Sequence, residues 1–144
     1  MILLDVNVLV VAHRPDGHRR GAEVHAWLTG RLTALERVGI DSHVLSAVAR
    51  IVTNPRIYEV PSSASAALSF CSAVINAPSA VRVNPSARHW SLFEERVLEL
   101  RLMGNDIPDA YLAALALDHD ASLATLDRGF RRFPGLRIVD PLAA

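Results

Sequence analysis

Three aspartates follow or begin segments that could bring them together. Asp5 comes directly after the apolar segment 1–4, and Asp127 comes after the apolar segment 122–126. Asp109 lies at the start of a segment with helical spacing. Clustered carboxylates repel one another unless a cation compensates. Because Mg²⁺ and Mn²⁺ prefer oxygen ligands, three acids that meet would favour a divalent-metal site.

Each of these acids has a second explanation as a helix cap. Aspartate is a favoured N-cap residue, and an acid in the first turn is stabilised by the helix dipole. Asp106 and Asp109 have the spacing of a capping box, with Asp where Glu or Gln is preferred. Asp127 could cap a short helix that follows it. The spacing alone leaves both explanations open.

Short apolar segments alternate with amphipathic ones along the chain, which predicts the elements that position these acids. We predict strands at 1–4, 39–40, 81–83, 122–126 and 136–139, and helices at 6–13, 20–35, 43–53, 64–75, 87–103, 108–119 and 128–133. This alternation predicts an α/β fold with a short, mostly parallel sheet of about 4–5 strands flanked by helices.

The predicted sheet gives a reason for the acids to meet. The carboxyl ends of parallel strands share one edge, and ligand sites form outside that edge. Asp5 and Asp127 each follow a predicted strand, so we expect both there. Asp109 joins them if its helix begins at the same edge.

Length and composition fit one globular domain covering residues 1–144. The chain has 144 residues, of which 51% are hydrophobic and 21% charged. No apolar run approaches the ~20 residues that span a bilayer, so no membrane contact is expected. Asp5 interrupts the apolar N-terminus, which reads as a strand and helix rather than a signal peptide, and we expect a cytoplasmic location. Cys71 is the single cysteine and is expected in the core.

The charge pattern allows a short nucleic-acid footprint. Basic and acidic residues number 15 each, so the net charge is zero, whereas proteins with long footprints on nucleic acid are usually basic. The basic residues are nevertheless grouped, in one cluster at 14–20 and another at Arg128, Arg131 and Arg132. Either cluster could contact phosphates or be a solvated helix end.

The histidines offer a rival chemistry, a zinc site or a histidine-based nuclease. Six are present, but they are scattered along the chain without close metal-ligand spacing. We expect His89 and His119 on helix surfaces. Trp27 and Trp90 fall on helical stripes, which favours packing in the core or a dimer over stacking on bases.

Four ordered segments resemble one known family. They are Asp5-Val6-Asn7-Val8-Leu9, residues 50–56 (RIVTNPR), residues 107–116 (IPDAYLAALA), and residues 126–130 (LDRGF) followed by Phe133, Pro134, Gly135 and Leu136. Together they resemble PIN-domain ribonucleases, and more closely the VapC-type toxins of bacterial VapBC toxin–antitoxin pairs. The resemblance runs from residue 3 to residue 141, which is nearly the whole chain.

This resemblance implies a PIN-like three-layer α/β fold and a sequence-specific endoribonuclease that requires Mg²⁺, with Mn²⁺ as a possible substitute. It implies structured RNA (transfer, ribosomal or messenger RNA) as the substrate. It also implies a homodimer and neutralisation by a cognate VapB-type antitoxin.

The resemblance also implies roles for individual residues. Asp5 and Asp109 would be metal ligands, and Asp127 would complete the catalytic acids by binding an outer ion or holding water. Asn7 and Thr125 would support these acids, with Asp106 as a further supporting acid.

The arginine cluster near the C-terminus would complete the interface with the substrate. Arg128, Arg131 and Arg132 would neutralise phosphates of the RNA on either side of the cut.

The sequence departs from the family at two positions. The family usually has a Glu where this chain has Ala47, and often an Asp where it has Gly129. Fewer carboxylates should weaken metal binding, above all for a second ion. Two hypotheses follow, a working site with three acids or a catalytically decayed PIN domain that binds RNA or antitoxin without cleaving.

Overall fold

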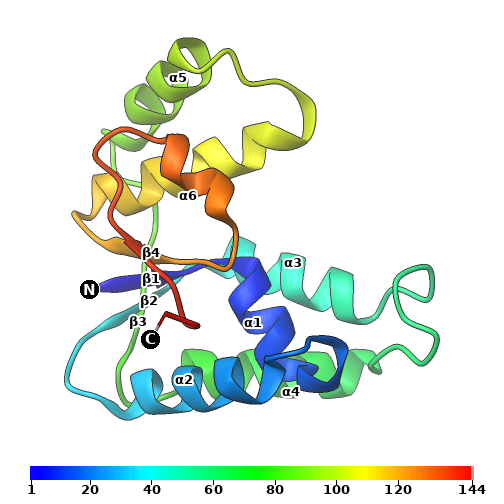
Figure 1. Cartoon of the computed structure of the whole chain (residues 1–144). Helices are drawn as coiled ribbons and strands as arrows, with labels where there is room; N and C mark the ends of the chain where they lie inside the picture. The colour runs from blue at the N-terminus through cyan, green and yellow to red at the C-terminus, as the bar shows by residue number, and fades with distance from the viewer. Residues whose placement is uncertain (144) are drawn as a thin grey trace.

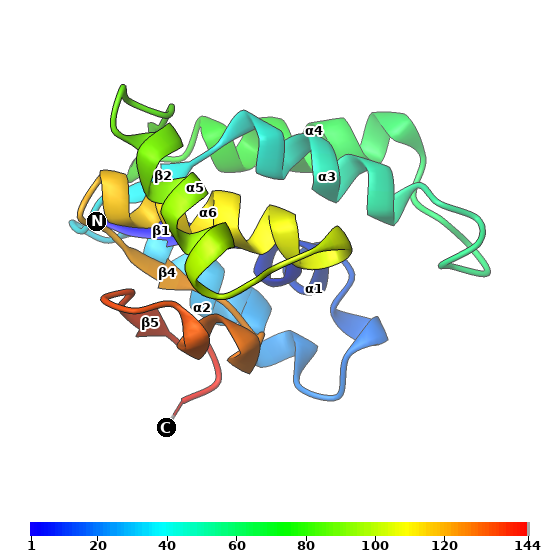
Figure 2. The ribbon, with the colours of Figure 1, turned by 90° about the horizontal axis from the view of Figure 1, so that it is seen from above.

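The computed structural model describes residues 1–143 and shows a sheet with helices on both faces (Figures 1 and 2). The strands are β1 (Ile2–Leu4), β2 (Val38–Ile40), β3 (Ala80–Arg82), β4 (Ser122–Ala124) and β5 (Ile138–Val139). The helices are α1 (Val6–His13), α2 (Gly21–Thr33), α3 (Ser42–Val52), α4 (Ala64–Ile75), α5 (His89–Glu99) and α6 (Ile107–Asp118). Three short 3₁₀ helices are η1 (Pro15–Gly17), η2 (Gly104–Asp106) and η3 (Arg128–Arg132).

The sheet confirms the predicted α/β class. Its strand order is β3-β2-β1-β4-β5, and all four strand pairs are parallel. The central strand β1 pairs on one side with β2, with Leu3 opposite Gly39, and on the other with β4, with Leu3 opposite Leu123. All carboxyl ends therefore lie along one edge of the sheet.

The helices form two layers, one on each face. Figure 1 shows α5 and α6 on one side of the sheet and α1, α2 and α4 on the other. Within these layers α5 packs against α6, and α1 packs against α2 and α3. The connection from β1 to β2 therefore runs over one face through α1 and α2, and the connection from β3 to β4 runs over the other through α5 and α6. The gap between β1 and β4 is a topological switch point, where α/β folds commonly bind ligands.

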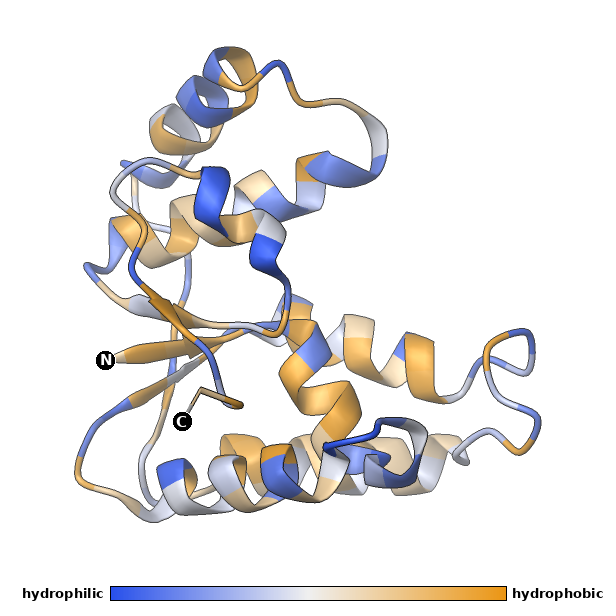
Figure 3. Cartoon of the chain, in the orientation of Figure 1, coloured by the Kyte–Doolittle hydropathy of each residue, from blue (hydrophilic) through white to orange (hydrophobic). Residues whose placement is uncertain are grey.

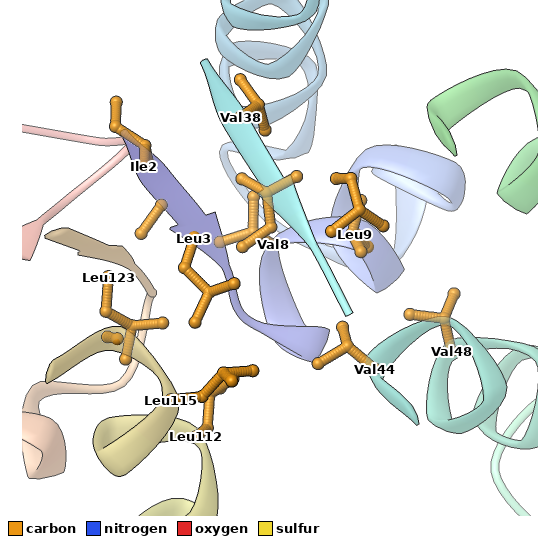
Figure 4. Close-up of a cluster of buried hydrophobic side chains, with 14 of the residues drawn as sticks. Ile2, Leu3, Val8, Leu9, Val38, Val44, Val48, Leu112, Leu115 and Leu123 are labelled. Atoms are coloured by element: carbon orange, nitrogen blue, oxygen red, sulfur yellow. The ribbon is translucent and has the colours of Figure 1, made fainter. Parts of the chain in front are cut away.

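Burial on both faces explains the continuous apolar strands. β1 and β2 are buried at every residue, as expected for parallel strands covered by helices on both sides. Figure 4 shows Leu3 among side chains from neighbouring strands and helices, including Leu115 of α6 and Val8 of α1. Figure 3 shows β1 as hydrophobic, in agreement with its burial. Among residues 1–143, no helix is both long and apolar enough to cross a membrane.

The helix α5 is shorter than the predicted segment 87–103, which was wrong at its end. The chain leaves the helix after Glu99, and Arg101 adopts a left-handed conformation with φ of 53°. The amide of Leu102 then donates to the carbonyl of Val97 at 3.0 Å, and the amide of Arg101 to that of Leu98. These bonds form a Schellman motif, which ends helices although glycine usually occupies the left-handed position. Sequence periodicity continued past this point and hid the turn.

The start of α2 passes very close to the segment that follows α1. A Cβ atom on Gly21 would lie 1.9 Å from the carbonyl oxygen of Pro15, far inside any normal contact. The Gly21 amide also donates to the carbonyl of His18 at 3.0 Å. Only glycine therefore allows η1 and α2 to pack at this separation.

Asp118 connects the end of α6 to the segment before α5, and we expect its charge to stabilise the fold. Both its oxygens accept hydrogen bonds from Ser86, one from the amide at 2.8 Å and one from the hydroxyl. Partial burial opposes ionisation, but the two bonds from Ser86 outweigh it and lower the pKa of Asp118. The stabilisation is therefore present above the ordinary carboxyl pKa and is lost as the pH falls through the lowered value.

Asp118→Asn should accordingly lower the free energy of unfolding by about 1–2 kcal/mol at pH 7, because a bond to a charged group contributes about 1.5–3 kcal/mol and asparagine keeps one of the two acceptors. Urea unfolding at pH 7 and pH 3 measures this, and the difference from the wild type should shrink at pH 3. An equal loss at both pH values would show that the charge is not responsible.

Candidate active site

Asp5 lies at the carboxyl end of β1, where the chain turns into α1, and only 6% of its surface is exposed. Its Oδ1 accepts a hydrogen bond from the Val6 amide at 2.7 Å, which caps the helix. Its Oδ2 accepts from Asn7 Nδ2 at 2.8 Å and from Thr125 Oγ1 at 2.6 Å. These three donors fix the carboxylate, and each oxygen keeps capacity for a further interaction.

A small polar network joins the ends of β1 and β4. Thr125 Oγ1 accepts from the amide of Asp127 at 3.0 Å and from Asn7 Nδ2 at 3.1 Å. Asn7 Oδ1 accepts from the amide of Leu126 at 3.1 Å. The hydrogen bonds expected from Asn7 and Thr125 to an acid are thus present, and both go to Asp5. The network spans the switch point and positions Asp5 against the chain beyond β4.

Asp127 is exposed and acts as a helix cap. Its Oδ1 accepts from the Gly129 amide at 2.7 Å, which begins η3 as the sequence allowed. A Cβ at position 129 would lie 3.0 Å from this oxygen, so glycine permits the close approach. The charge of Asp127 raises the pKa values of Asp5 and Asp109, although burial contributes more to each. Asp127 therefore faces the same region as the other two acids.

Asp109 lies in the first turn of α6 and pairs with an arginine from η3. Arg132 Nη2 is 3.0 Å from Asp109 Oδ2 and 3.6 Å from Asp106 Oδ1. Asp106 precedes α6 but makes no side-chain capping bond, so the predicted capping role for it is wrong. Its carboxylate is directed to Arg132 instead. The guanidinium is thus a built-in counterion for the acids at the start of α6.

Two of the acids resist ionisation in the isolated protein. Burial raises the pKa of Asp5, and hydrogen bonds from Thr125, Val6 and Asn7 offset only part of this effect. Burial also raises the pKa of Asp109, which Arg132 counteracts and the neighbouring carboxylates reinforce. An additional cation beside Asp5 and Asp109 would relieve both desolvation and mutual repulsion.

Asp5 and Asp109 line one cavity of about 370 Å³. Its wall comes from the end of β1, the start of α6 and one face of α3, and Ala47 lies in that wall. The remaining lining residues are Val6, Asp41, His43, Val44, Ser46, Arg50, Ile51, Pro108, Tyr111 and Leu112. A cavity of this size, mostly apolar with a few polar groups, is typical of a ligand site.

The donor set fits a hard divalent cation that is held by few protein ligands. Among residues 1–143, no three acidic, histidine or cysteine side chains converge into a ready-made metal cluster. Mg²⁺ commonly binds through one or two carboxylates and takes its other ligands from water and substrate phosphates. Asp5 and Asp109 supply such a pair, and the raised pKa values of both favour a cation between them.

The basic residues are arranged differently from the sequence interpretation. Arg128 and Arg131 are exposed on η3, whereas Arg132 is engaged with Asp109 and Asp106. Arg50 was not among the candidates, yet its exposed side chain lines the acidic cavity. Its position one turn after Ala47 on α3 was the available signal, because residues three apart share a helix face.

Two side chains expected at the surface or in the core can now be placed. Cys71 is buried as predicted. His89 is also buried, at 4% exposure, and its Nε2 is hydrogen-bonded to the carbonyl of Tyr111 at 3.0 Å, so the prediction of a surface position was wrong. The histidine joins α5 to α6, a long-range role that helical periodicity did not indicate.

Comparison with known proteins identifies the family. The family model of the PIN domain matches residues 2–136. The chain belongs to the PIN-domain family. This PIN domain is 41% identical over 142 residues to ribonuclease VapC43 of Mycobacterium tuberculosis, an alignment that covers 99% of this chain and 96% of the relative. It is 38% identical over 141 residues to ribonuclease VapC31 of the same species, covering 98% and 99%.

Solved structures confirm the fold of this PIN domain. VapBC2 from Rickettsia felis, bound to a DNA fragment from its promoter, matches with a TM-score of 0.68 and 20% identity. That match covers 96% of this chain and 98% of the solved chain. VapBC-1 from nontypeable Haemophilus influenzae also matches with a TM-score of 0.68, at 15% identity. The expected PIN-like architecture is therefore confirmed.

Proposed function

We propose that this PIN domain is the toxin of a type II toxin–antitoxin pair and acts as a Mg²⁺-dependent endoribonuclease. The observation that carries the proposal is the pair Asp5 and Asp109, which line one cavity and both have raised pKa values. The relatives named VapC ribonucleases support the reaction class.

In the proposed mechanism, each acid has a defined task. When bound, Mg²⁺ would lower the pKa of a water molecule and stabilise charge on the phosphoryl oxygens. Asp5 holds its carboxylate rigidly through Asn7 and Thr125, and Asp109 presents its own from the start of α6. Asp127 would orient the attacking water or hold a second ion once RNA supplies further oxygens. Cleavage by water leaves a 5′-phosphate and does not use the 2′-hydroxyl as nucleophile.

We further propose that the substrate is structured transfer, ribosomal or messenger RNA, which the chain cuts sequence-specifically. Arg128 and Arg131 extend from η3 beside the acids and would neutralise flanking phosphates. Arg132 would contribute once the cation takes over its interaction with Asp109. Arg50, which lines the cavity from α3, would contact the substrate as well.

The proposed partners are a VapB-type antitoxin and a second copy of the chain. The structural neighbours include VapBC complexes, which supports an antitoxin as partner. Exposed apolar side chains on α4 and α5, Leu68 and Leu98, would be covered in such an assembly.

A second function, binding without cleavage, is favoured by Ala47 alone. Its side chain lies in the cavity wall, where the family usually has a carboxylate. Ala47→Glu separates the two functions. If the site already works with three acids, the RNA-cleavage activity of the variant should be close to that of the wild type. If the site has decayed, the variant should gain a cleavage activity that the wild type lacks.

Purified protein, free of antitoxin and incubated with total bacterial RNA, tests the proposed reaction. We expect discrete products with 5′-phosphates in Mg²⁺ or Mn²⁺ and none in EDTA. Asp109→Asn should reduce the cleavage rate at least ~100-fold. Loss of a metal ligand removes several kcal/mol of transition-state stabilisation, and each 1.4 kcal/mol corresponds to about tenfold in rate. If folded wild-type protein cleaves no RNA in either metal, the proposed endoribonuclease activity is refuted.

A further inference from the structure

A second cavity lies at the far end of α1, away from the catalytic acids. It has a volume of about 270 Å³ and is enclosed by the end of α1, by η1 and by the connection of residues 53–63 that joins α3 to α4. Figure 1 shows this connection as the loop to the right of α3. The cavity shares no lining residue with the acidic cavity. We call it the basic cavity, because it includes the start of the basic cluster at 14–20.

Arg14 is a fixed cation in the wall of the basic cavity. Its guanidinium carbon lies 4.2 Å from the centre of the Tyr58 ring, and its Nη1 donates a hydrogen bond to Ser62 Oγ at 3.1 Å. Within the described part of the chain, no acid forms an ion pair with it. Because a guanidinium has five N–H groups, Arg14 keeps donors for a ligand. All three side chains are partly exposed, so a ligand can reach them.

A histidine lies beside this cation and shares its serine partner. His13 Nε2 is 3.0 Å from Ser62 Oγ, and its ring packs against the ring of Phe70 with centroids 4.7 Å apart. Ser62 accepts a bond from Arg14, so its own proton remains available to His13 or to a ligand. Burial lowers the pKa of His13 and the charge of Arg14 lowers it further, so the imidazole is neutral at pH 7.

These groups favour an anion of a particular kind. The planar guanidinium of Arg14 matches the paired oxygens of a phosphate, and a hydroxyl group can donate to a third oxygen. Asp16 also lines the cavity, and the carbonyl groups at the end of α1 carry partial negative charge. Both oppose a ligand of high charge. The balance therefore favours a phosphodiester with a single charge over a free phosphate or phosphomonoester, which carries nearly two.

We propose that the basic cavity binds a backbone phosphate of the RNA at a distance from the cut, with Arg14 and Ser62 as its donors. The inference rests on the proposed function, because this phosphate belongs to the proposed substrate. The helix α1 starts beside Asp5 and ends at the basic cavity, and its eight residues span about 12 Å. A strand that follows α1 from the acids reaches the cavity within a few nucleotides. The second contact would fix the direction in which the strand leaves the cut.

His13 acts through Ser62 and is a positioning residue. A neutral imidazole can accept the Ser62 proton and withhold it from the RNA, whereas an imidazolium donates to Ser62 and leaves that proton for the phosphate. The charged groups that line the cavity beside it are Arg14 and Asp16. A bound phosphate adds a negative charge, which favours the imidazolium and should raise the pKa of His13. By linkage, RNA should bind more tightly below the pKa of the free protein, and this gain is lost as the pH rises through the raised value.

Binding of octauridylate to the full chain tests the proposal, in EDTA so that neither metal nor cleavage is needed. A backbone contact carries no base sequence, so this RNA serves as the probe. Fluorescence anisotropy gives the affinity at several NaCl concentrations. Arg14→Gln should weaken binding about 10-fold, the effect of one charged contact. It should also make the slope of log Kobs against log salt shallower by about 0.7, the value for one phosphate of a single strand.

Arg19→Gln is the matched control, because Arg19 is an exposed arginine of the same cluster that does not line the basic cavity. Its affinity for octauridylate should stay close to that of the wild type. Equal losses in Arg14→Gln and Arg19→Gln would overturn the proposal, because they would show general attraction between charges. If Arg14→Gln fails to fold, Ser62→Ala replaces it. This variant keeps the charge of Arg14 and should weaken binding about 3- to 10-fold without changing the salt slope.

NMR titration of the histidine signals tests the role of His13. We expect octauridylate to raise the pKa of His13 in the wild type and to leave it unchanged in Arg14→Gln. His13→Gln, whose amide can still bond to Ser62, should bind octauridylate at pH 8 as the wild type does and should gain less affinity at lower pH. If octauridylate leaves the pKa of His13 unchanged in the wild type, the positioning role is wrong.

A peptide of four glutamates is the competing probe. If it binds more tightly than octauridylate at equal salt, and Arg14→Gln removes that binding, the cavity belongs to a protein partner and the proposal is overturned. Failure of this inference and failure of the proposed function are distinguishable. RNA cleavage with octauridylate binding that does not depend on Arg14 leaves the nuclease intact and removes the phosphate site. Binding that depends on Arg14, without cleavage of any RNA in metal, does the reverse.

Discussion

Asp5→Asn should reduce RNA cleavage by roughly 10³-fold while the protein remains folded. Loss of the first carboxylate removes several kcal/mol of transition-state stabilisation, and each 1.4 kcal/mol corresponds to about tenfold in rate. The fold should tolerate the change because burial raises the pKa of Asp5, so its ionised form is costly at neutral pH. Asparagine keeps an oxygen that can accept the capping bond from Val6, but its amide nitrogen cannot accept the bonds that Asn7 and Thr125 donate to Oδ2. Removing the charge offsets this loss, so the free energy of unfolding should change by no more than about 1 kcal/mol.

Two measurements together check this expectation. Cleavage of a defined RNA in Mg²⁺ gives the activity, and thermal unfolding with and without Mg²⁺ gives the effect of the cation. The wild type should be stabilised by Mg²⁺, and Asp5→Asn should not. Asp120→Asn, which removes an exposed acid just before β4 at the opposite edge of the sheet, is the control and should retain both properties. If Mg²⁺ still stabilises Asp5→Asn against thermal unfolding, the cation binds at another site.

Gly21→Ala should be the most damaging conservative change in the fold. Its Cβ would lie 1.9 Å from the Pro15 carbonyl oxygen, and both partners are backbone, so no side chain can yield. α2 must then shift away from η1, which should cost about 3 kcal/mol, at the upper end for overpacking. Urea unfolding measures the loss.

Gly30→Ala tests the same exchange in the same helix where space is open. Nothing lies within 4 Å of a Cβ at position 30, and the residue is inside α2. Alanine should therefore stabilise the protein by about 0.5–1 kcal/mol through helix propensity alone. If both variants lost stability equally, the contact between Gly21 and Pro15 would not be the cause.

Local signals predicted most of the fold. The bounds of α1 and α4 follow from residues that lie next to their ends, Asp5 and Ser63, each of which caps its helix. The parallel sheet followed from the alternation of elements. The end of α5 could not be predicted, because Arg101 adopts a left-handed conformation that glycine normally marks.

The candidate site was predictable only where an acid follows a strand. Asp5 and Asp127 satisfy this rule, and the charges of both contribute to the raised pKa of Asp109. The partners of these acids were hidden, because pairs such as Arg132 with Asp109 depend on how η3 packs near α6. The basic cavity is likewise a property of the assembled fold, since Arg14 and Tyr58 are distant in sequence.

The position of β1 in the middle of the sheet has a consequence for protein synthesis. Asp5 leaves the ribosome 120 residues before its hydrogen-bond donor Thr125. Until β4 emerges, β1 lacks one of its two neighbouring strands and Asp5 lacks half of its network. A nascent chain that has emerged only as far as β3 therefore contains no assembled site, and the activity proposed here can begin only after β4 has been synthesised.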